Sequence, residues 1–128
     1  MSSVDRPFIL LVDDDALVAK AMARTLARAA AVDHADGIAA ALERIATAPN
    51  YDLILCDLFL GAARGTELYQ SLLERYPGYA TRLAFMSGFG ETPRELETLR
   101  HVPCFGKPVP VDAVIALARE GRSLRFGS

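Results

Sequence analysis

The sequence places acidic side chains, a hydroxyl group and an ammonium group where apolar runs end. Phe8–Val12, Leu53–Cys56 and Leu83–Met86 are followed by Asp13-Asp14-Asp15, Asp57 and Ser87, and Lys107-Pro108 follows a fourth run. If these runs are strands of a parallel sheet, their carboxyl ends meet at one edge, which is where ligands bind in open α/β sheets. The polar side chains would then gather in one small space.

Three carboxylates in one place repel one another unless one is protonated or a cation neutralises them. Mg²⁺, or Mn²⁺ in its place, prefers oxygen ligands and keeps several waters, which leaves room for a phosphoryl oxygen. An aspartate in such a site can attack phosphorus and become an aspartyl phosphate. Lys107 and Ser87 would stabilise the charge on the phosphoryl oxygens. The pattern therefore predicts a site for a divalent cation and a phosphoryl group.

The apolar runs alternate with helical patterns along the chain. We expect strands at Phe8–Val12, Ala31–His34, Leu53–Asp57, Leu83–Ser87 and Val102–Phe105. We expect helices at residues 16–29, 37–48, 66–76, 92–100 and 111–119. Such an alternation predicts an α/β fold with a five-stranded parallel sheet and helices on both of its faces.

Several local features follow from residue types. Asp15 suits the N-cap of the first helix, because its carboxylate can accept hydrogen bonds from first-turn amides. The apolar face of that helix is assigned to Leu17, Val18, Met22 and Leu26. Pro77 and the glycine after it are expected to end the third helix. Residues 61–65 are expected to form a loop, and residues 121–128 a polar tail without regular structure.

The composition is that of one ordinary globular domain, which we place over residues 1–128. The net charge of −2 argues against non-specific binding to nucleic acid or to anionic membranes. No apolar run approaches the roughly 18 residues of a membrane-spanning helix, so we expect no membrane insertion and a cytoplasmic location. Cys56 and Cys104 lie within apolar runs and are expected to be buried rather than joined in a disulfide framework.

These motifs resemble the receiver domains of bacterial two-component response regulators. The resemblance covers about residues 7–120 and rests on Val12-Asp13-Asp14-Asp15, Leu55-Cys56-Asp57-Leu58-Phe59-Leu60, Gly65, Met86-Ser87-Gly88 and Lys107-Pro108. It implies a flavodoxin-like (βα)5 fold with strand order 2-1-3-4-5. It also implies phosphorylation with Mg²⁺ by a sensor histidine kinase or a histidine phosphotransfer protein, and signalling to a downstream protein that the sequence does not name.

The resemblance further implies a role for each polar residue. Asp57 would be the phosphoacceptor. The metal ligands would be Asp13, Asp14, Asp57 and the backbone carbonyl of Phe59. Ser87 would be the switch hydroxyl and Lys107 the partner of the phosphate, aimed by a Lys107-Pro108 peptide bond that is often cis in the family.

Five positions depart from the family pattern, and the first is Gly61, which stands where the family commonly has proline. Arg64 stands where the family commonly has aspartate, and Cys104 where it usually has tyrosine or phenylalanine. Phe59 and Phe89 lie two residues past the phosphoacceptor and two past the switch hydroxyl, where polar side chains help to hold the hydrolytic water. Two aromatic rings would exclude that water or leave it without orientation. We therefore expect slow self-dephosphorylation.

Two other functions fit parts of the pattern. In a haloacid-dehalogenase-like phosphatase, Asp13 would be the nucleophile and Asp15 the general acid and base, but this leaves Asp57 unexplained. A receiver fold could also serve only as a binding module that is never phosphorylated. The receiver interpretation makes the protein a signalling phosphoacceptor rather than an enzyme, either standing alone or belonging to a larger protein.

Overall fold

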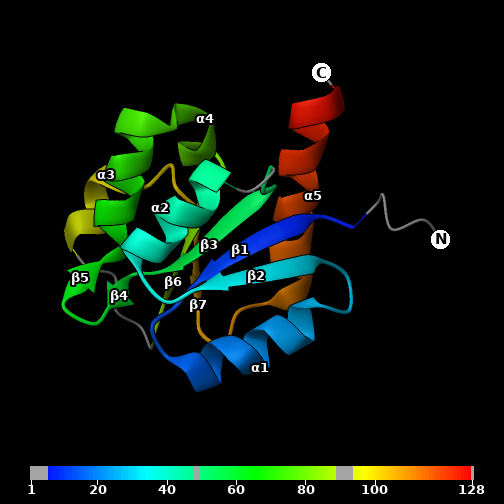
Figure 1. Ribbon diagram of the computed structural model, residues 1–128, viewed down its shortest axis with the longest axis horizontal. Helices are drawn as coiled ribbons and strands as arrows, with labels where there is room; N and C mark the ends of the chain where they lie inside the picture. Colours follow the sequence, from blue (N-terminus) through cyan, green and yellow to red (C-terminus); the bar gives the residue numbers. More distant parts are fainter. Residues whose placement is uncertain (1–5, 48–49, 89–93, 128) are drawn as a thin grey trace.

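A five-stranded parallel sheet forms the centre of the computed structural model, which describes residues 6–47, 50–88 and 94–127 (Figure 1). Its strands are β1 (Phe8–Val12), β2 (Ala31–Ala35), β3 (Leu53–Asp57), β6 (Leu83–Ser87) and β7 (Cys104–Gly106). They lie in the order β2-β1-β3-β6-β7. Counted within the sheet this is 2-1-3-4-5, so the expected fold class and strand order are confirmed.

Helices cover both faces of the sheet (Figure 1). One face packs against α1 (Ala16–Leu26) and α5 (Val111–Gly127), and the other against α2 (Ile38–Thr47) and α3 (Gly65–Arg75). The short helix α4 (Pro77–Ala80) follows α3, and a 3-10 helix, η2 (Arg94–Leu99), precedes β7. Within the described residues, no helix is both long and apolar enough to cross a membrane.

The central strands read as continuous apolar runs because both faces of the sheet are buried. Ile9 and Leu11 pack toward α1 and α5, whereas Leu10 and Val12 pack toward α2 and α3. The register pairs Val12 with Cys56 in β3, and Asp57 with Met86 in β6. The polar residues at the ends of these three strands therefore reach the same edge of the sheet.

The apolar face assigned to the first helix was partly wrong. Leu17 and Val18 are exposed, with residue accessibilities of 81% and 39%, and α1 ends at Leu26. The helix packs through Ala19 and the predicted Leu26, which are fully buried, with the predicted Met22 packed against the same core. The buried face is therefore turned from the predicted one, toward alanine positions that let the helix lie close to the sheet. Asp15 caps the helix as predicted.

The segment between β3 and β6 contains more regular structure than expected. Two short strands, β4 (Phe59–Leu60) and β5 (Ala63–Arg64), form an antiparallel hairpin in place of the predicted loop. Gly61 makes the turn with a φ of 64°, a conformation that glycine adopts without strain. Pro77 begins α4 rather than only ending α3, because proline suits the first position of a helix.

The edge strand β7 also departs from expectation. It spans Cys104–Gly106 instead of Val102–Phe105, and the prediction that Cys104 is buried was wrong, because this residue is exposed. An edge strand has a neighbour on one side only, and β7 is just three residues long. Cys56, in the central strand β3, is buried as expected.

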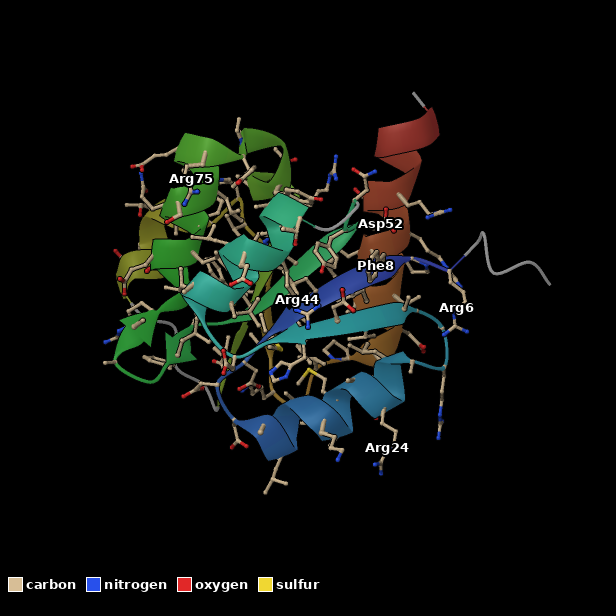
Figure 2. The ribbon with its side chains drawn as sticks, in the orientation of Figure 1. Arg6, Phe8, Arg24, Arg44, Asp52 and Arg75 are labelled. Carbon is tan, nitrogen blue, oxygen red and sulfur yellow. The ribbon has the colours of Figure 1, made fainter. Side chains whose placement is uncertain are left out.

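Residues 121–127 were expected to form a tail without regular structure, but they are helical, because α5 continues to Gly127. Figure 2 shows Asp52 and Phe8 close together at the end of the sheet where β1 and β3 begin. Buried Asp52 accepts a hydrogen bond of 2.8 Å from the Phe8 amide and lies 3.6 Å from the guanidinium group of Arg122. This ion pair holds the last turns of α5 against the sheet, a contact that the polar sequence of the tail did not indicate.

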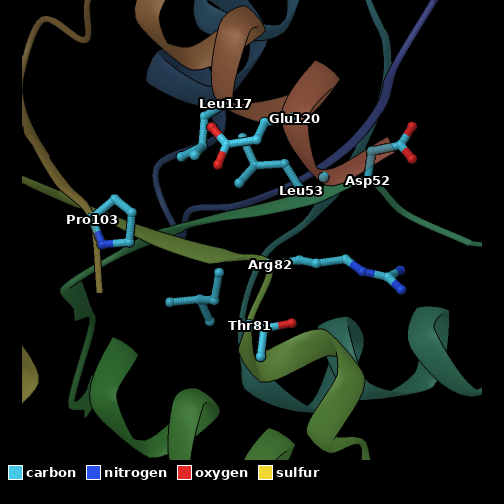
Figure 3. A pocket seen from close by; sticks show the side chains of 9 residues that line it. Asp52, Leu53, Thr81, Arg82, Pro103, Leu117 and Glu120 are labelled. Atoms are coloured by element: carbon cyan, nitrogen blue, oxygen red, sulfur yellow. The ribbon is translucent and has the colours of Figure 1, made fainter. Parts of the chain in front are cut away.

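Gly121 lies where α5 passes the backbone of Asp52, the residue before β3. A β-carbon at this position would lie 2.4 Å from the carbonyl oxygen of Asp52. Beside this contact is a small cavity of about 50 Å³, lined by residues that include Asp52, Arg82, Leu117 and Glu120 (Figure 3). Gly121 was expected to begin a tail without regular structure, but in the structure its lack of a side chain lets α5 pass Asp52.

Replacing Gly121 with alanine is expected to destabilise the protein. The added methyl group must push α5 away from Asp52, and such overpacking costs about 1–3 kcal/mol of unfolding free energy despite the better helix propensity of alanine. Urea denaturation followed by circular dichroism measures this change. The control is Gly78→Ala in α4, where a β-carbon meets nothing within 4 Å. Equal stability of the two variants would contradict the packing argument.

Candidate functional site

Three carboxylates meet at the carboxyl edge of the sheet. One oxygen from each of Asp13, Asp14 and Asp57 lies within 4.8 Å of the other two. Asp13 and Asp57 are buried, at 0% and 6% exposure, whereas Asp14 is exposed. Asp13 follows β1, and Asp57 ends the neighbouring strand β3 in register with it. Asp14 is the residue after Asp13. The structure thus brings together the three acids that the sequence singled out.

Asp13 is held on nearly all sides. Its Oδ1 accepts a hydrogen bond of 2.9 Å from the Asp15 amide, and its own amide donates to the carbonyl of Ala35 at 3.1 Å. Its Oδ2 is buried and has no hydrogen-bond partner among the described residues. Burial raises the pKa of Asp13, and the nearby carboxylates raise it further, although the Asp15 amide and Lys107 oppose the shift. An ionised oxygen left in this position favours a neighbouring cation.

Lys107 supplies positive charge to the cluster. Its Nζ lies 2.5 Å from Asp57 Oδ2 and 3.6 Å from Asp13 Oδ2. Burial alone would lower the pKa of Lys107, but the hydrogen bond and negative charge of Asp57, followed by the charge of Asp13, outweigh it and raise the pKa. The side chain is therefore an ammonium ion at neutral pH. The Lys107-Pro108 peptide bond is cis, as the resemblance implied.

Ser87 ends β6 beside this group and is 7% exposed. Its backbone carbonyl accepts a hydrogen bond of 2.8 Å from the Lys107 amide, which ties the end of β6 to the lysine. The thiol of Cys104 lies 3.9 Å from the hydroxyl oxygen of Ser87. A small sulfur atom, rather than an aromatic ring, is therefore the neighbour of this hydroxyl group.

The β4–β5 hairpin borders the acids. The Phe59 amide donates a hydrogen bond of 3.1 Å to Asp57 Oδ1. The guanidinium group of Arg64 lies over the Phe59 ring, 4.6 Å from its centroid, a cation–π contact. A β-carbon on Gly65 would lie 2.4 Å from the carbonyl oxygen of Asp57, so glycine is needed where α3 begins. Phe89, the second aromatic residue of the prediction, lies outside the described residues.

The sequence analysis missed one neighbour of the site. His34 has no acidic residue of the site near it in the sequence and carried no predicted role, yet its Nε2 lies 2.8 Å from the backbone carbonyl of Asp13. No sequence motif connects residues on β1 and β2. Only the pairing of these two strands brings the ring to the acidic turn.

Asp15 is not one of the three clustered acids and performs the predicted capping role. Its Oδ1 accepts hydrogen bonds of 3.1 Å from the amides of Leu17 and Val18. The phosphatase alternative needs Asp15 as a general acid and base, but Oδ1 of this residue already accepts two backbone hydrogen bonds. The geometry favours the alternative in which Asp57, not Asp15, completes the site.

The donor set fits a hard divalent cation. All three side chains offer oxygen, the type of ligand that Mg²⁺ prefers, and the exposed Asp14 leaves one side of the site open to water. The Oδ2 of Asp13, which has no hydrogen-bond partner among the described residues and lies 3.6 Å from the ammonium nitrogen of Lys107, provides a specific position for a cation. The ammonium group of Lys107 is bound to Asp57 and lies too far from Asp13 Oδ2 to form a hydrogen bond with it.

The family model of the response regulator receiver domain matches residues 9–118. The chain belongs to the response regulator receiver domain family. This membership connects the domain with two-component, phosphorelay signalling, and the acidic cluster fits the Mg²⁺ binding of such domains. No curated protein matches the sequence of this chain.

Solved structures share the fold of this receiver domain. The Francisella response regulator 1452 receiver domain has a TM-score of 0.75 and 22% identity, over 94% of this chain and 99% of that one. A response regulator receiver protein from Pseudomonas putida has a TM-score of 0.72 and 24% identity, over 90% and 97%. A receiver domain protein from Clostridium thermocellum has a TM-score of 0.78 and 15% identity, over 93% and 96%.

Neutralising Asp13 is expected to stabilise the metal-free receiver domain while removing its response to Mg²⁺. A raised carboxyl pKa means that the folded state disfavours the charged form, so Asp13→Asn should raise the unfolding temperature by a few degrees at pH 7. This advantage should vanish below the ordinary pKa of 3.8, where the wild-type carboxyl group is also protonated. Calorimetry with and without MgCl₂ measures both effects.

The matched control for this measurement is Asp36→Asn, an exposed acid outside the cluster. The wild type and the control should both gain stability with Mg²⁺ by mass action. A gain of the same size in Asp13→Asn would show that Asp13 does not take part in cation binding.

Proposed function

We propose that this receiver domain takes a phosphoryl group onto Asp57 from a phosphohistidine of a sensor histidine kinase or of a histidine phosphotransfer protein. One observation carries the proposal: Asp57, at the end of a buried strand, lies in direct contact with Lys107 and within 4.8 Å of two other carboxylates. Asp57 can act as the nucleophile. The ammonium group, with a pair of acids that can hold a cation, provides the charges that a transferring phosphoryl group requires.

In the proposed transfer, a carboxylate oxygen of Asp57 attacks phosphorus, and the phosphorus–nitrogen bond of the phosphohistidine breaks. The electron pair of that bond returns to the imidazole, which takes up a proton from solvent. Asp57 Oδ1 is held by the Phe59 amide and Oδ2 by Lys107, so the carboxylate is oriented before the donor arrives. The ammonium group can then pass from Asp57 to a phosphoryl oxygen and remain paired.

We propose Asp13, Asp14 and Asp57 as the ligands of a Mg²⁺ ion, with the backbone carbonyl of Phe59 as a fourth. When bound, the ion would neutralise negative charge on the phosphoryl oxygens. The Asp13 Oδ2 atom, which lacks a hydrogen-bond partner among the described residues, supports its role as a ligand. Ser87 would donate a hydrogen bond to one phosphoryl oxygen, because its hydroxyl group stands at the end of the strand next to β3.

Receiver domains act as signalling phosphoacceptors and are not generally classed as enzymes. For this domain we propose that phosphorylation changes its contacts with a downstream protein, without direct binding to nucleic acid, in the cytoplasm. The link between Ser87 and Cys104 is the route by which the phosphoryl group would affect the edge strand β7. The usual aromatic switch is replaced here by a thiol, so the change at this edge involves a smaller side chain.

Asp57→Asn is expected to abolish phosphorylation. With Mg²⁺ and a small phosphodonor such as phosphoramidate, the wild-type domain should gain one acid-stable, base-labile phosphoryl group detectable by intact-protein mass spectrometry. Asp15→Asn is the matched control, because asparagine can also cap α1, and it should be labelled like the wild type. Labelling of Asp57→Asn, with loss in Asp13→Asn, would instead favour the phosphatase. Absence of labelling in the wild type would favour the unphosphorylated binding module.

The lifetime of the phosphoryl group should be long. Phe59 has no polar group to hold a hydrolytic water, and its ring is covered by Arg64. The Phe59→Asn, Phe89→Glu variant should lose its phosphoryl group roughly tenfold faster, because polar groups can orient the attacking water. The decay is followed by mass spectrometry after removal of the donor. Phe59→Leu, Phe89→Leu is the control and should stay slow, and equal decay of both variants would contradict the proposal.

A further inference from the structure

His34 reaches the acidic turn from the neighbouring strand. The register pairs His34 of β2 with Leu11 of β1, whose side chain packs toward α1 and α5. From this face the half-buried ring places Nε2 2.8 Å from the backbone carbonyl oxygen of Asp13. A carbonyl oxygen only accepts hydrogen bonds, so Nε2 must carry the proton and donate.

This hydrogen bond completes the restraints on Asp13. The amide of Asp13 donates to Ala35, its Oδ1 accepts from the Asp15 amide, and its carbonyl accepts from His34. Asp13 Oδ2 is the side-chain atom left for a cation. Two of these three hydrogen bonds join Asp13 to residues of β2, so β2 orients the acid that follows β1.

The Asp13 carbonyl also belongs to the peptide unit that leads to Asp14. A peptide unit is planar, so a hydrogen bond to its oxygen fixes the direction in which the chain continues. Asp14 is exposed, and its carboxylate still lies within 4.8 Å of the other two acids. Two side-chain hydrogen bonds hold the backbone on either side of Asp14: the Asp15 amide donates to Asp13 Oδ1, and His34 donates to the Asp13 carbonyl.

We propose that His34 is a positioning residue of the cation site, which it serves without touching the ion. By holding the Asp13–Asp14 peptide unit it keeps both carboxylates turned toward Asp57. The proposal rests on the cation site of the proposed function. It assigns part of the cation affinity to a hydrogen bond in the second layer of the site, where such partners typically contribute 10–100-fold.

The test compares Mn²⁺ binding to three variants, using electron paramagnetic resonance to count the free ion and Mg²⁺ to compete for the site. His34→Leu keeps an apolar side chain but removes the donor, and it should bind roughly tenfold more weakly than the wild type. His34→Gln places an amide donor the same number of bonds from the backbone, and it should restore most of the affinity. Rescue by glutamine distinguishes a hydrogen bond from packing.

Asp33→Ala is the matched control on the same strand. Asp33 lies on the opposite face of β2, where it accepts a hydrogen bond of 2.7 Å from the Tyr51 hydroxyl group and pairs with Arg44 at 3.4 Å. The substitution should lower stability but leave Mn²⁺ affinity unchanged. If Asp33→Ala weakens binding as much as His34→Leu, general loosening of β2 is the cause and the proposal fails.

Two further outcomes would overturn the proposal. Affinity of His34→Leu equal to that of the wild type would show that the hydrogen bond does not position the acids. Affinity of His34→Gln as low as that of His34→Leu would show that a donor at this place is not sufficient. Absence of Mn²⁺ and Mg²⁺ binding in the wild type is a different result, because it removes the proposed cation site itself.

Discussion

The mutual repulsion of Asp13, Asp14 and Asp57 is the constraint on which this structure depends. Like charges this close, two of them on buried side chains, raise the free energy of the folded state unless positive charge is near. Lys107 offsets part of this cost through Asp57 and leaves Asp13 Oδ2 without a hydrogen bond. The fold tolerates the remaining repulsion because the acids stand at the end of a well-packed sheet. A bound cation would relieve this repulsion.

Strand β3 connects this site with a second buried acid. Asp52 precedes the strand and Asp57 ends it, and both lie almost completely out of contact with water. Asp52 is satisfied by the Phe8 amide and Arg122, and it fastens α5 to the sheet. Asp57 is satisfied by the Phe59 amide and by the movable ammonium group of Lys107. The same residue type therefore fastens α5 to the sheet at one end of the strand and pairs with a lysine in the acidic cluster at the other.

The features that distinguish this domain surround its reactive residues. The guanidinium group of Arg64 lies over the ring of Phe59, an apolar side chain two residues past Asp57. Cys104 lies next to Ser87, where a large ring would couple the hydroxyl group to a wider surface. His34 restrains the acidic turn from β2. In the proposed function, these residues would affect the lifetime of the phosphoryl group, signalling or cation affinity while the acids remain the same.

The sequence by itself determined the order of the five sheet strands along the chain and the edge where Asp13, Asp57 and Lys107 meet, since apolar runs and the acids that end them are local patterns. It also placed the Asp15 cap, which involves neighbouring amides only. Only the tertiary structure decided that Leu17 faces water, that Gly121 passes Asp52 and that His34 holds Asp13. These facts depend on how segments far apart in the sequence pack together. The type of a single residue does not reveal which distant segment will lie against it.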